Sequence, residues 1–483
     1  MGHLPDLAAR RAQLAPEATA FIDHETGRRW TFAQVDQAAA RLGAALLNKV
    51  AAGARVGLLS LNRPEVFIAL FACQKAGLIL APLNWRQPVA ELGPVVASID
   101  CTLILHDDDF APTAHALGLP CLPLDIPGDG PALAPAEIDE TAPWYVLFTS
   151  GTTGNPKAVI QTARMVVANA MNIAQCMRLT SEDRTLNYLP LFHTGGINLF
   201  TMPLFLWGGC TTVLRKFDAP DLVALIGQGA VTQFFGVPAI YQALMAMDLS
   251  GVDLGSLRGW ACGGAALPEA TIQHFAERGA LICNGFGMTE TGPTGFLLDR
   301  DAVLRKIGSV GKPQFMTEAR LDGVPDGEPG TGEIQLRGPT VTPGYLDNPE
   351  ATRAAFTADG WLRSGDVATR DDEGFYRIVD RIKDMYISGG ENVYPAEVEK
   401  VLITHPDILD AAVIGVPDTR WGETGVAFLI ARNGSLPGPQ DLSDWLRQRL
   451  AGYKLPRAFH AVDDFPRTAA GKIRKTELRK LLA

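Results

Sequence analysis

The first segment whose residue types suggest chemistry is Thr149-Ser150-Gly151-Thr152-Thr153-Gly154-Asn155-Pro156-Lys157. It places four hydroxyls, two glycines and a lysine in nine residues directly after an apolar run. Glycines let a backbone approach a ligand closely, and amides, hydroxyls and an ammonium group together suit a polyphosphate. The segment is not a Walker A loop, because Pro156 stands where that motif has Gly and a β-like Ala-Val-Ile run follows Lys157. An ordinary polar hairpin turn is the alternative, which the density of hydroxyls disfavours.

A second polar, glycine-rich segment is Asn284-Gly285-Phe286-Gly287-Met288-Thr289-Glu290-Thr291-Gly292. It does not fit the dinucleotide-binding pattern, because GxGxxG requires Gly where Glu290 stands. A single carboxylate beside threonines can hold Mg2+, which binds few protein carboxylates and completes its shell with water and phosphate oxygens. A solvated loop glutamate is the alternative interpretation.

Three further segments carry charge at turns. Asp366 ends the turn that starts at Gly360, and its carboxylate either accepts hydrogen bonds from two ribose hydroxyls or forms an Asx turn. The charged run 380–384 follows a strand-like stretch and is either a hinge between domains or a salt-bridged linker. Residues 467–480 contain six basic groups and one acid. They form a solvated basic tail, or they deliver a lysine to an anion.

The spacing of apolar residues predicts the elements that must position these segments. Helices are expected at 31–48, 65–76, 164–177, 222–227, 396–404 and 440–451, and strands at 55–61, 78–82, 144–148, 185–189, 233–237, 408–416 and 425–431. A Pro/Gly-rich connection is expected at 119–143, and short strands between turns at 311–341. The alternation predicts an α/β protein with an N-terminal domain over residues 1–382 and a C-terminal α+β domain over 383–483.

Composition limits the class of protein. The chain has 483 residues, 47% of them hydrophobic, and a net charge of -10, which excludes disorder as the main state and disfavours nucleic-acid binding. The longest nearly apolar stretch, 199–207, is too short to span a membrane, and no secretory signal is visible. Seven cysteines without a CxxC pair disfavour a disulfide framework or a zinc site. A soluble cytoplasmic enzyme is expected. Its oligomeric state is left open, and a homo-oligomer is one of the alternatives.

Taken together and in this order, the segments resemble the adenylate-forming superfamily of acyl-CoA synthetases, adenylation domains and firefly luciferase. The resemblance extends from near Thr31 to Lys472 and is strongest toward AMP-forming carboxylic acid–CoA ligases of the benzoate, 4-coumarate and medium-chain types. Its most specific parts are Ser-Gly-Gly-Glu-Asn-Val-Tyr-Pro-Ala-Glu-Val-Glu at 388–399 and Pro-Arg-Thr-Ala-Ala-Gly-Lys at 466–472.

This resemblance implies a fold and a reaction. The fold is a large N-terminal domain of two α/β subdomains and a small β-rich subdomain, followed by a small, mobile α+β domain that carries the catalytic lysine. The reaction is an ATP-dependent ligation in two steps through an acyl-adenylate, with ATP, Mg2+, coenzyme A and a small carboxylic acid as ligands.

The resemblance also implies residue roles. Thr289 contacts the α-phosphate, Glu290 supports Mg2+, and Asp366 and Arg381 hold the ribose. The β- and γ-phosphates are bound by Thr149, Ser150, Gly151, Thr152, Thr153, Gly154 and Lys157. The adenine pocket is lined by Gly263, Gly264, Ala265, Asn284, Gly285, Phe286 and Gly287.

The remaining implied roles concern catalysis and movement. Lys472 bridges the substrate carboxylate and the α-phosphate, Lys383 is the hinge, and His193 gates the acyl pocket. Ser388, Gly389 and Gly390 form the face used in the thioester-forming step. Two residues depart from the family pattern: Phe286 stands where many relatives have Tyr, and Ala158 where Gly is common.

The acyl pocket is expected to be mainly apolar and to contain neither Lys nor Arg, which favours an aromatic or medium-chain aliphatic acid over a dicarboxylate. Its expected residues are Phe192, His193, Ile197, Phe235, Gly236, Val237, Gly263, Phe286, Met288 and Pro293. Two alternatives stay open: a freestanding adenylation enzyme that loads a carrier protein, and a non-catalytic nucleotide-binding regulator. Oxidation of the luciferase type is not excluded by any motif.

Overall fold

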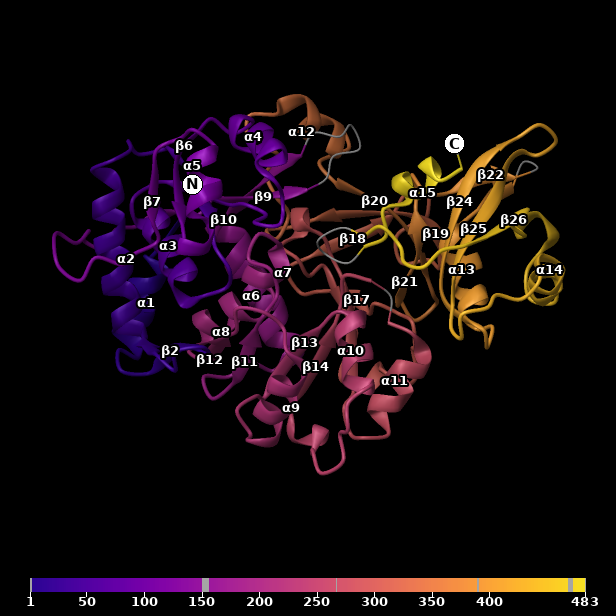
Figure 1. The fold of residues 1–483 in the computed structure, drawn as a ribbon. Coiled ribbons are helices and arrows are strands. Elements are labelled where there is room, and N and C mark those ends of the chain that lie inside the picture. The colour runs from indigo at the N-terminus through magenta and orange to yellow at the C-terminus, as the bar shows by residue number, and fades with distance from the viewer. Residues whose placement is uncertain (1, 150–155, 266, 389–390, 468–471, 483) are drawn as a thin grey trace. The chain divides into compact units, whose positions relative to one another are not determined.

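The computed structural model describes residues 2–149, 156–265, 267–388, 391–467 and 472–482. The chain forms two compact units (Figure 1). Unit 1 contains Met1–Ala319 and Leu336–Leu362, and unit 2 contains Arg320–Gln335 and Arg363–Ala483. These units are groups of residues that pack together. The predicted boundary between residues 382 and 383 is instead the point about which the C-terminal domain is expected to rotate. That boundary therefore stays a prediction.

The first sheet of unit 1 has six strands in the order β10-β9-β5-β4-β6-β7. Its strands are β4 (Arg55–Leu59), β5 (Ile79–Pro82), β6 (Cys101–His106), β7 (Cys121–Pro123), β9 (Pro143–Thr149) and β10 (Lys157–Thr162). Strands β9 and β10 pair antiparallel, and all the other pairs are parallel. A parallel sheet requires crossover segments, which here are largely helical.

Two further sheets complete unit 1, together with the small pair β1 (His3–Leu4) and β8 (Ile138–Asp139). The second sheet, in the order β11-β12-β2-β3, contains β2 (Thr19–Asp23), β3 (Arg29–Thr31), β11 (Arg184–Asn187) and β12 (Cys210–Val213). The third sheet contains β13 (Gln233–Gly236), β14 (Gly259–Cys262), β15 (Ile282–Phe286), β16 (Phe296–Leu297) and β17 (Lys312–Pro313). Strands β13, β14 and β15 are parallel, so their carboxyl ends meet at one edge.

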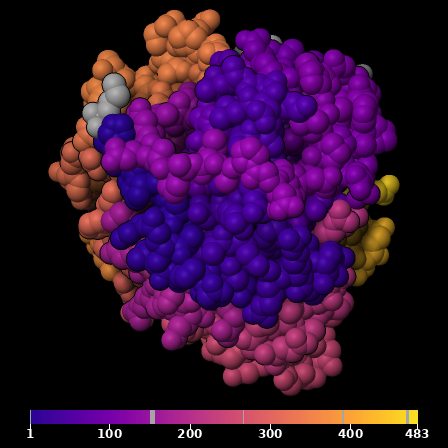
Figure 2. Space-filling model, turned by 90° about the vertical axis from the view of Figure 1, so that its left-hand side faces the viewer, coloured from indigo at the N-terminus to yellow at the C-terminus, as the bar shows by residue number. Residues whose placement is uncertain are grey.

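Helices cover these sheets, and α9, α10 and α11 lie beside β13 and β14 (Figure 1). The helices of unit 1 are α1 (Leu7–Leu14), α2 (Phe32–Leu47), α3 (Pro64–Lys75), α4 (Val89–Ala97), α5 (Ala111–Ala116), α6 (Ala163–Met177), α7 (Thr194–Asn198), α8 (Thr201–Trp207), α9 (Ala219–Gly227), α10 (Pro238–Met245), α11 (Glu269–Ala276) and α12 (Pro349–Ala355). Helix α2 starts with a capping box between Thr31 and Gln34, which satisfies two backbone donors at its N-terminus. The first part of the chain, in indigo and purple, forms most of the surface in Figure 2.

The core of unit 1 is built around stacked aromatic rings. Phe71 and Phe205 have ring centroids 4.6 Å apart, and Phe21 stacks on Phe67 at 5.1 Å. Phe32 meets Phe205 edge-on at 5.1 Å, so the first residue of α2 is tied to α8. All five rings are essentially buried, and aromatic pairs of this kind contribute about 0.5–1.5 kcal/mol beyond the area that they bury.

In the residues that the structure describes, unit 2 contains one complete sheet, most of another and three helices. Most of the four-stranded sheet belongs to it, with β18 (Glu318–Leu321), β19 (Gly330–Arg337), β20 (Leu362–Arg370) and β21 (Tyr376–Arg381). The five-stranded sheet contains β22 (Tyr386–Ser388), β23 (Glu391–Val393), β24 (Ile408–Asp418), β25 (Gly422–Ala431) and β26 (Ala458–Ala461). The helices are α13 (Pro395–Ile403), α14 (Pro439–Arg447) and α15 (Lys475–Lys480). Helices α13 and α14 bury Val398, Leu402, Leu442 and Leu446 in one core cluster with β24 and β25.

The α/β architecture with a large N-terminal and a small C-terminal part is confirmed. Each expected helix and strand is present within a few residues, although α14 ends at Arg447 instead of continuing to 451. The expected irregular connection at 119–143 was incomplete, because it contains β7 and β8. Short edge strands of this kind carry too few residues for a period to be visible. In the described part of the chain, no helix has the length and apolar character to cross a membrane.

Candidate functional site

The hydroxyl-rich segment connects the two strands of a hairpin. Thr149 ends β9 and faces Lys157, the first residue of β10, across an antiparallel pair. The β-like run after Lys157 is therefore a strand, as expected, and this separates the segment from a Walker loop. The Lys157 ammonium lies 4.9 Å from the centre of the Tyr345 ring. Ser150, Gly151, Thr152, Thr153 and Gly154 lie outside the described residues.

The two glycine-rich segments of the expected adenine pocket meet at the carboxyl ends of β14 and β15. Cys262 and Asn284 are register partners, so Gly263, directly after β14, lies beside Gly285 on β15. A Cβ on Gly263 would lie 3.4 Å from both the Gly285 carbonyl oxygen and the Phe235 ring. Gly264 has a φ of +83°, a backbone conformation that residues with a Cβ rarely adopt. Ala265 follows it and is exposed. The Asn284 side chain donates to the Ser309 carbonyl over 3.3 Å.

Backbone also meets backbone after β15. A Cβ on Gly287 would lie 1.6 Å from the Pro293 carbonyl oxygen, so only glycine fits there. The half-buried Phe286 ring lies 5.9 Å from Phe296 on the neighbouring strand. This tight return leads the chain into the 3-10 turn Thr289–Thr291, which carries the expected metal-supporting carboxylate.

Glu290 is buried, with 6% of the residue exposed. Its Oε1 accepts a hydrogen bond of 3.1 Å from the Tyr345 hydroxyl, and its backbone carbonyl accepts one of 2.8 Å from the Thr342 amide. The Thr289 carbonyl accepts from the Gln161 side chain over 3.0 Å. Burial, together with the nearby Glu290 carboxylate, raises the pKa of Tyr345, so this phenol stays a donor at neutral pH.

A buried carboxylate held by one phenol fits the needs of Mg2+, which takes one or two protein carboxylates and completes its shell with phosphate oxygens and water. Tyr345 was missed in the sequence analysis, because 55 residues separate it from Glu290 and no spacing rule joins them. Its position in Gly344-Tyr345-Leu346, between turn residues, is the only sequence signal.

His193 lies on the segment that leaves the carboxyl end of β11 and enters α7. The Tyr188 hydroxyl on this segment donates to the Phe235 carbonyl over 2.6 Å, which ties the segment to β13. The rings of Phe192 and His193 lie 4.6 Å apart. His193, Phe235 and the glycines of the expected adenine pocket thus lie at or just after the carboxyl ends of β11, β13, β14 and β15. Ile197 is 1% exposed and belongs to the hydrophobic core of unit 1.

A buried polar network behind this segment was also missed. The Asn198 side chain accepts from the Tyr145 hydroxyl over 2.7 Å and contacts Thr194 at 3.1 Å. Its backbone carbonyl accepts from Asn169 over 2.6 Å. Buried polar groups with partners make one packing arrangement preferable to others. Asparagines within otherwise apolar helical runs were the available signal.

In unit 2 the structure brings Asp366 and Arg381 together. They are directly opposite on β20 and β21, and the Arg381 Nε donates to Asp366 Oδ1 over 3.0 Å. The Asp366 side chain is 7% exposed and the Arg381 side chain 39%. The neighbouring Asp380 carboxylate accepts from the Ala396 amide over 2.7 Å at the N-terminus of α13, and burial raises the pKa of Asp380. The charged run is therefore anchored at its first two residues by specific hydrogen bonds.

The other expected residues of unit 2 lie apart from this pair in the chain. Lys383 is exposed in the turn between β21 and β22, and Ser388 is buried opposite Glu391 on β23. Lys472 is exposed and precedes Ile473, which forms a bridge with Arg467. Gly389, Gly390 and residues 468–471 lie outside the described residues.

Comparison with known proteins defines the class. Residues 8–346 match the AMP-binding enzyme family, and residues 397–472 match the AMP-binding enzyme C-terminal domain. Among curated relatives, a feruloyl-CoA synthase from Amycolatopsis sp is 41% identical over 98% of this chain and 97% of its own. An indoleacetate–CoA ligase from Aromatoleum aromaticum is 36% identical over the same shares.

A solved structure of the o-succinylbenzoate CoA synthetase from Bacillus subtilis, in complex with its acyl-adenylate intermediate, has a TM-score of 0.89. It is 31% identical, and the match covers 99% of both chains. The chain therefore belongs to the AMP-binding, adenylate-forming enzyme family.

The buried Glu290 generates a testable prediction. Glu290→Gln removes a negative charge and should lower the rate of adenylate formation by about 10²-fold while raising the Mg2+ concentration needed for half-maximal rate. Tyr345→Phe should shift both quantities in the same direction by a smaller factor, since it removes one hydrogen bond to the carboxylate. Pyrophosphate release at several Mg2+ concentrations measures both effects.

Glu269→Gln, on the first turn of α11, is the matched control and should behave as the native protein. An unchanged Mg2+ dependence in Glu290→Gln would contradict a role for this carboxylate at the metal.

Proposed function

We propose that this AMP-forming acid–CoA ligase acts on an aromatic carboxylic acid. The observation that carries the proposal is the set of aromatic side chains at the carboxyl edge of β13, β14 and β15. The Phe235 ring lies 3.4 Å from the position that a Cβ on Gly263 would take. Phe286 is the last residue of β15. Phe192 is buried beside His193 on the segment tied to Phe235 by Tyr188. Flat, polarisable walls of this kind favour an aromatic ring over a flexible chain.

The relatives support the same substrate class. Feruloyl-CoA synthase and indoleacetate–CoA ligase are named for aromatic acids. The Arg86 guanidinium lies 5.7 Å from the centre of the Phe192 ring. Arg86 is exposed and stacks on Trp85 at 4.8 Å, so it is not a buried partner for a second carboxylate.

The reaction proceeds in two steps with ATP, Mg2+ and coenzyme A. A carboxylate oxygen of the acid attacks the α-phosphorus of ATP, the bond to the bridging oxygen breaks, and pyrophosphate leaves. The thiolate of coenzyme A then attacks the acyl carbon, the acyl–phosphate bond breaks, and AMP leaves. The first step joins two anions, so the enzyme must stabilise negative charge in the transition state.

In our proposal unit 1 supplies most of the nucleotide site. The segment Thr149–Lys157 binds the β- and γ-phosphates, Thr289 contacts the α-phosphate, and Glu290 supports Mg2+. The glycine-rich segments at the carboxyl ends of β14 and β15 line the adenine. His193 controls entry to the acyl pocket from the end of β11.

In unit 2, Asp366 accepts hydrogen bonds from the ribose hydroxyls and Arg381 holds the Asp366 carboxylate in place. Lys472 neutralises the substrate carboxylate and the α-phosphate during the first step. Rotation at Lys383 then replaces Lys472 by the face that contains Ser388, which opens a path for coenzyme A. A cytoplasmic location is proposed as well, since ATP and coenzyme A are both consumed; a homo-oligomeric state stays a prediction.

The substrate proposal is tested by a panel of acids that includes cinnamic, indoleacetic, benzoic and straight-chain aliphatic acids. AMP and CoA-thioester formation should give a kcat/KM at least tenfold higher for the aromatic acids than for straight-chain acids of similar size, which corresponds to about 1.4 kcal/mol. A preference for straight-chain acids would overturn the aromatic assignment and leave the ligase class intact.

Lys472→Ala should reduce acyl-adenylate formation by about 10²–10³-fold or more, because it removes a full positive charge from the transition state. Thioester formation from supplied acyl-AMP should continue at nearly the native rate. Lys480→Ala, which removes an exposed lysine paired with Glu477 on α15, is the control. An equal loss in both half-reactions would show that Lys472 has a structural role.

Lys383→Pro should separate the half-reactions in the opposite way. Proline fixes φ near −65°, so the backbone cannot alternate between two conformations at this exposed turn. A single turnover should still release pyrophosphate, while thioester formation should fall by orders of magnitude. Lys383→Ala keeps the backbone free and should retain both steps. Native thioester formation in the proline variant would refute rotation at this residue.

A further inference from the structure

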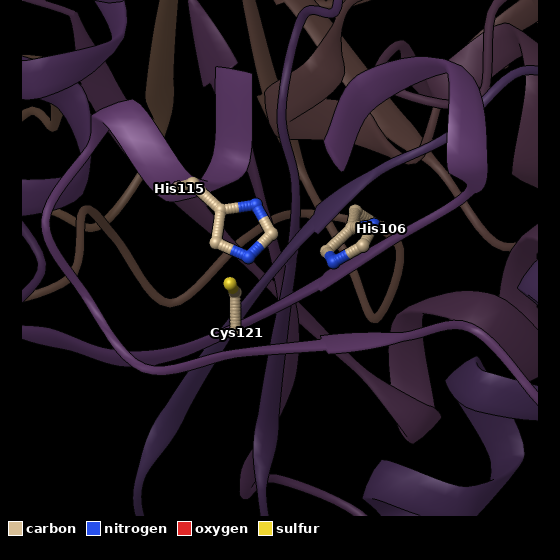
Figure 3. Close-up of side chains that lie close together, drawn as sticks. All are labelled: His106, His115 and Cys121. Carbon is tan, nitrogen blue, oxygen red and sulfur yellow. The ribbon is translucent and has the colours of Figure 1, made fainter. Parts of the chain in front are cut away.

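Two histidines and a cysteine converge at the edge of the six-stranded sheet of unit 1. His106 ends β6, Cys121 begins the edge strand β7, and His115 lies on α5 between them. One possible ligand atom from each residue lies within 4.8 Å of the other two. Figure 3 shows a ring nitrogen of His115 next to the Cys121 sulfur and the His106 ring on the other side of the gap. No residue with a role in the proposed ligation belongs to β6, α5 or β7.

The hydrogen bonds of the two imidazoles determine which nitrogen is available. His106 Nδ1 lies 3.0 Å from the Asp107 carbonyl oxygen, and His115 Nδ1 lies 2.6 Å from the Ala111 carbonyl oxygen. A carbonyl oxygen only accepts, so each Nδ1 carries its proton and each Nε2 of the neutral ring keeps its lone pair. Metal-binding histidines are typically oriented in this way, with the second ring nitrogen donating to a backbone carbonyl.

The three side chains do not satisfy one another. Within the described residues, no hydrogen bond joins His106, His115 and Cys121, although their rings and sulfur are neighbours. His106 is 3% exposed, whereas Cys121 is half-buried and His115 is exposed, so a solute can reach the gap from the His115 side.

We propose that His106 Nε2, His115 Nε2 and Cys121 Sγ bind a zinc ion that fastens the edge strand β7 and helix α5 to β6. Two imidazole nitrogens and one thiolate are a ligand set that zinc prefers, and water occupies the fourth tetrahedral position. Zinc–ligand bonds of about 2.0–2.3 Å place the ligand atoms about 3.4–3.6 Å apart. The ligands must therefore move inward by about 1 Å, which an exposed side chain on a short helix and the first residue of an edge strand allow.

Binding is balanced by the release of one proton. Cys121 enters as a thiol, its sulfur forms the bond to zinc, and the thiol proton goes to the buffer. The cysteine pattern disfavours a zinc site in this chain, and the proposal departs from that expectation. A mixed site over residues 106–121 has no recognised spacing and becomes visible only when β6 and β7 pair.

The chain offers a closely matched control. Cys210 is also half-buried and also begins a strand, β12, and burial raises the pKa of its thiol to about 11. Within the described residues, Cys210 belongs to no group of side chains that could hold a metal ion together, so it is a suitable control. His274 on α11 contacts Arg278 and is the corresponding control for His115.

The full-length protein, stripped of metal with a chelator, is titrated with Co2+ and then with Zn2+ in the absence of ATP. We expect one Co2+ to bind per chain. The bound ion should show a thiolate charge-transfer band in the near ultraviolet and the visible bands of tetrahedral Co2+. Zn2+ should displace the Co2+, so that both sets of bands disappear. Cys121→Ser and His115→Ala should lose the thiolate band and weaken metal binding at least tenfold, while Cys210→Ser and His274→Ala should match the native protein. Zn2+ should raise the Tm of the native protein and of both controls only.

Circular dichroism of the metal-free variants checks that each is folded; His115→Ala alters an exposed side chain, so it keeps the test valid if Cys121→Ser is destabilised. A thiolate band that persists in Cys121→Ser would overturn the proposal. Metal binding by the native protein no tighter than by His115→Ala would overturn it as well.

Discussion

Close contact between backbone segments at the carboxyl ends of three parallel strands is the constraint on which the rest of unit 1 depends. At Gly287 a single added Cβ would lie 1.6 Å from the Pro293 carbonyl oxygen, and at Gly263 it would touch both the Gly285 carbonyl and the Phe235 ring. At Gly287 the contact leaves no space for a side chain, so the two backbone segments pack directly on each other. These contacts also direct the chain into the turn that buries Glu290.

The buried carboxylate shows how electrostatics follows from this packing. Glu290 receives the Tyr345 hydroxyl, and Tyr345 also presents its ring to the Lys157 ammonium. One phenol thereby contacts both the carboxylate expected at the metal and the lysine expected at the phosphates. A buried charged group needs hydrogen-bond partners. For Glu290, Tyr345 is such a partner, and it comes from a segment remote in sequence.

In unit 2, the pairing of two neighbouring strands positions the charged residues Asp366 and Arg381. The antiparallel register of β20 and β21 places Asp366 directly opposite Arg381, so two residues 15 positions apart hold each other in position. The adjacent Asp380 is fastened to the first turn of α13. The turn that contains Lys383 therefore starts from a well-anchored strand end, and this suits a hinge, because a rotation is transmitted only if the segment before it stays rigid.

The sequence by itself determined the α/β architecture, most helices and strands, and the segments that carry the chemistry. Apolar periodicity, glycine content and the order of motifs are local properties, and they were enough to predict the family and to single out Glu290, Asp366, Arg381 and Lys472 as candidate site residues. Tertiary structure alone decided which side chains meet. It placed Tyr345 beside Glu290 and the Asn198 network behind His193, and it brought His106, His115 and Cys121 together at the sheet edge. The reason is physical. Hydrogen bonds and metal geometry act over about 3 Å between atoms, and only strand pairing and packing bring distant segments that close.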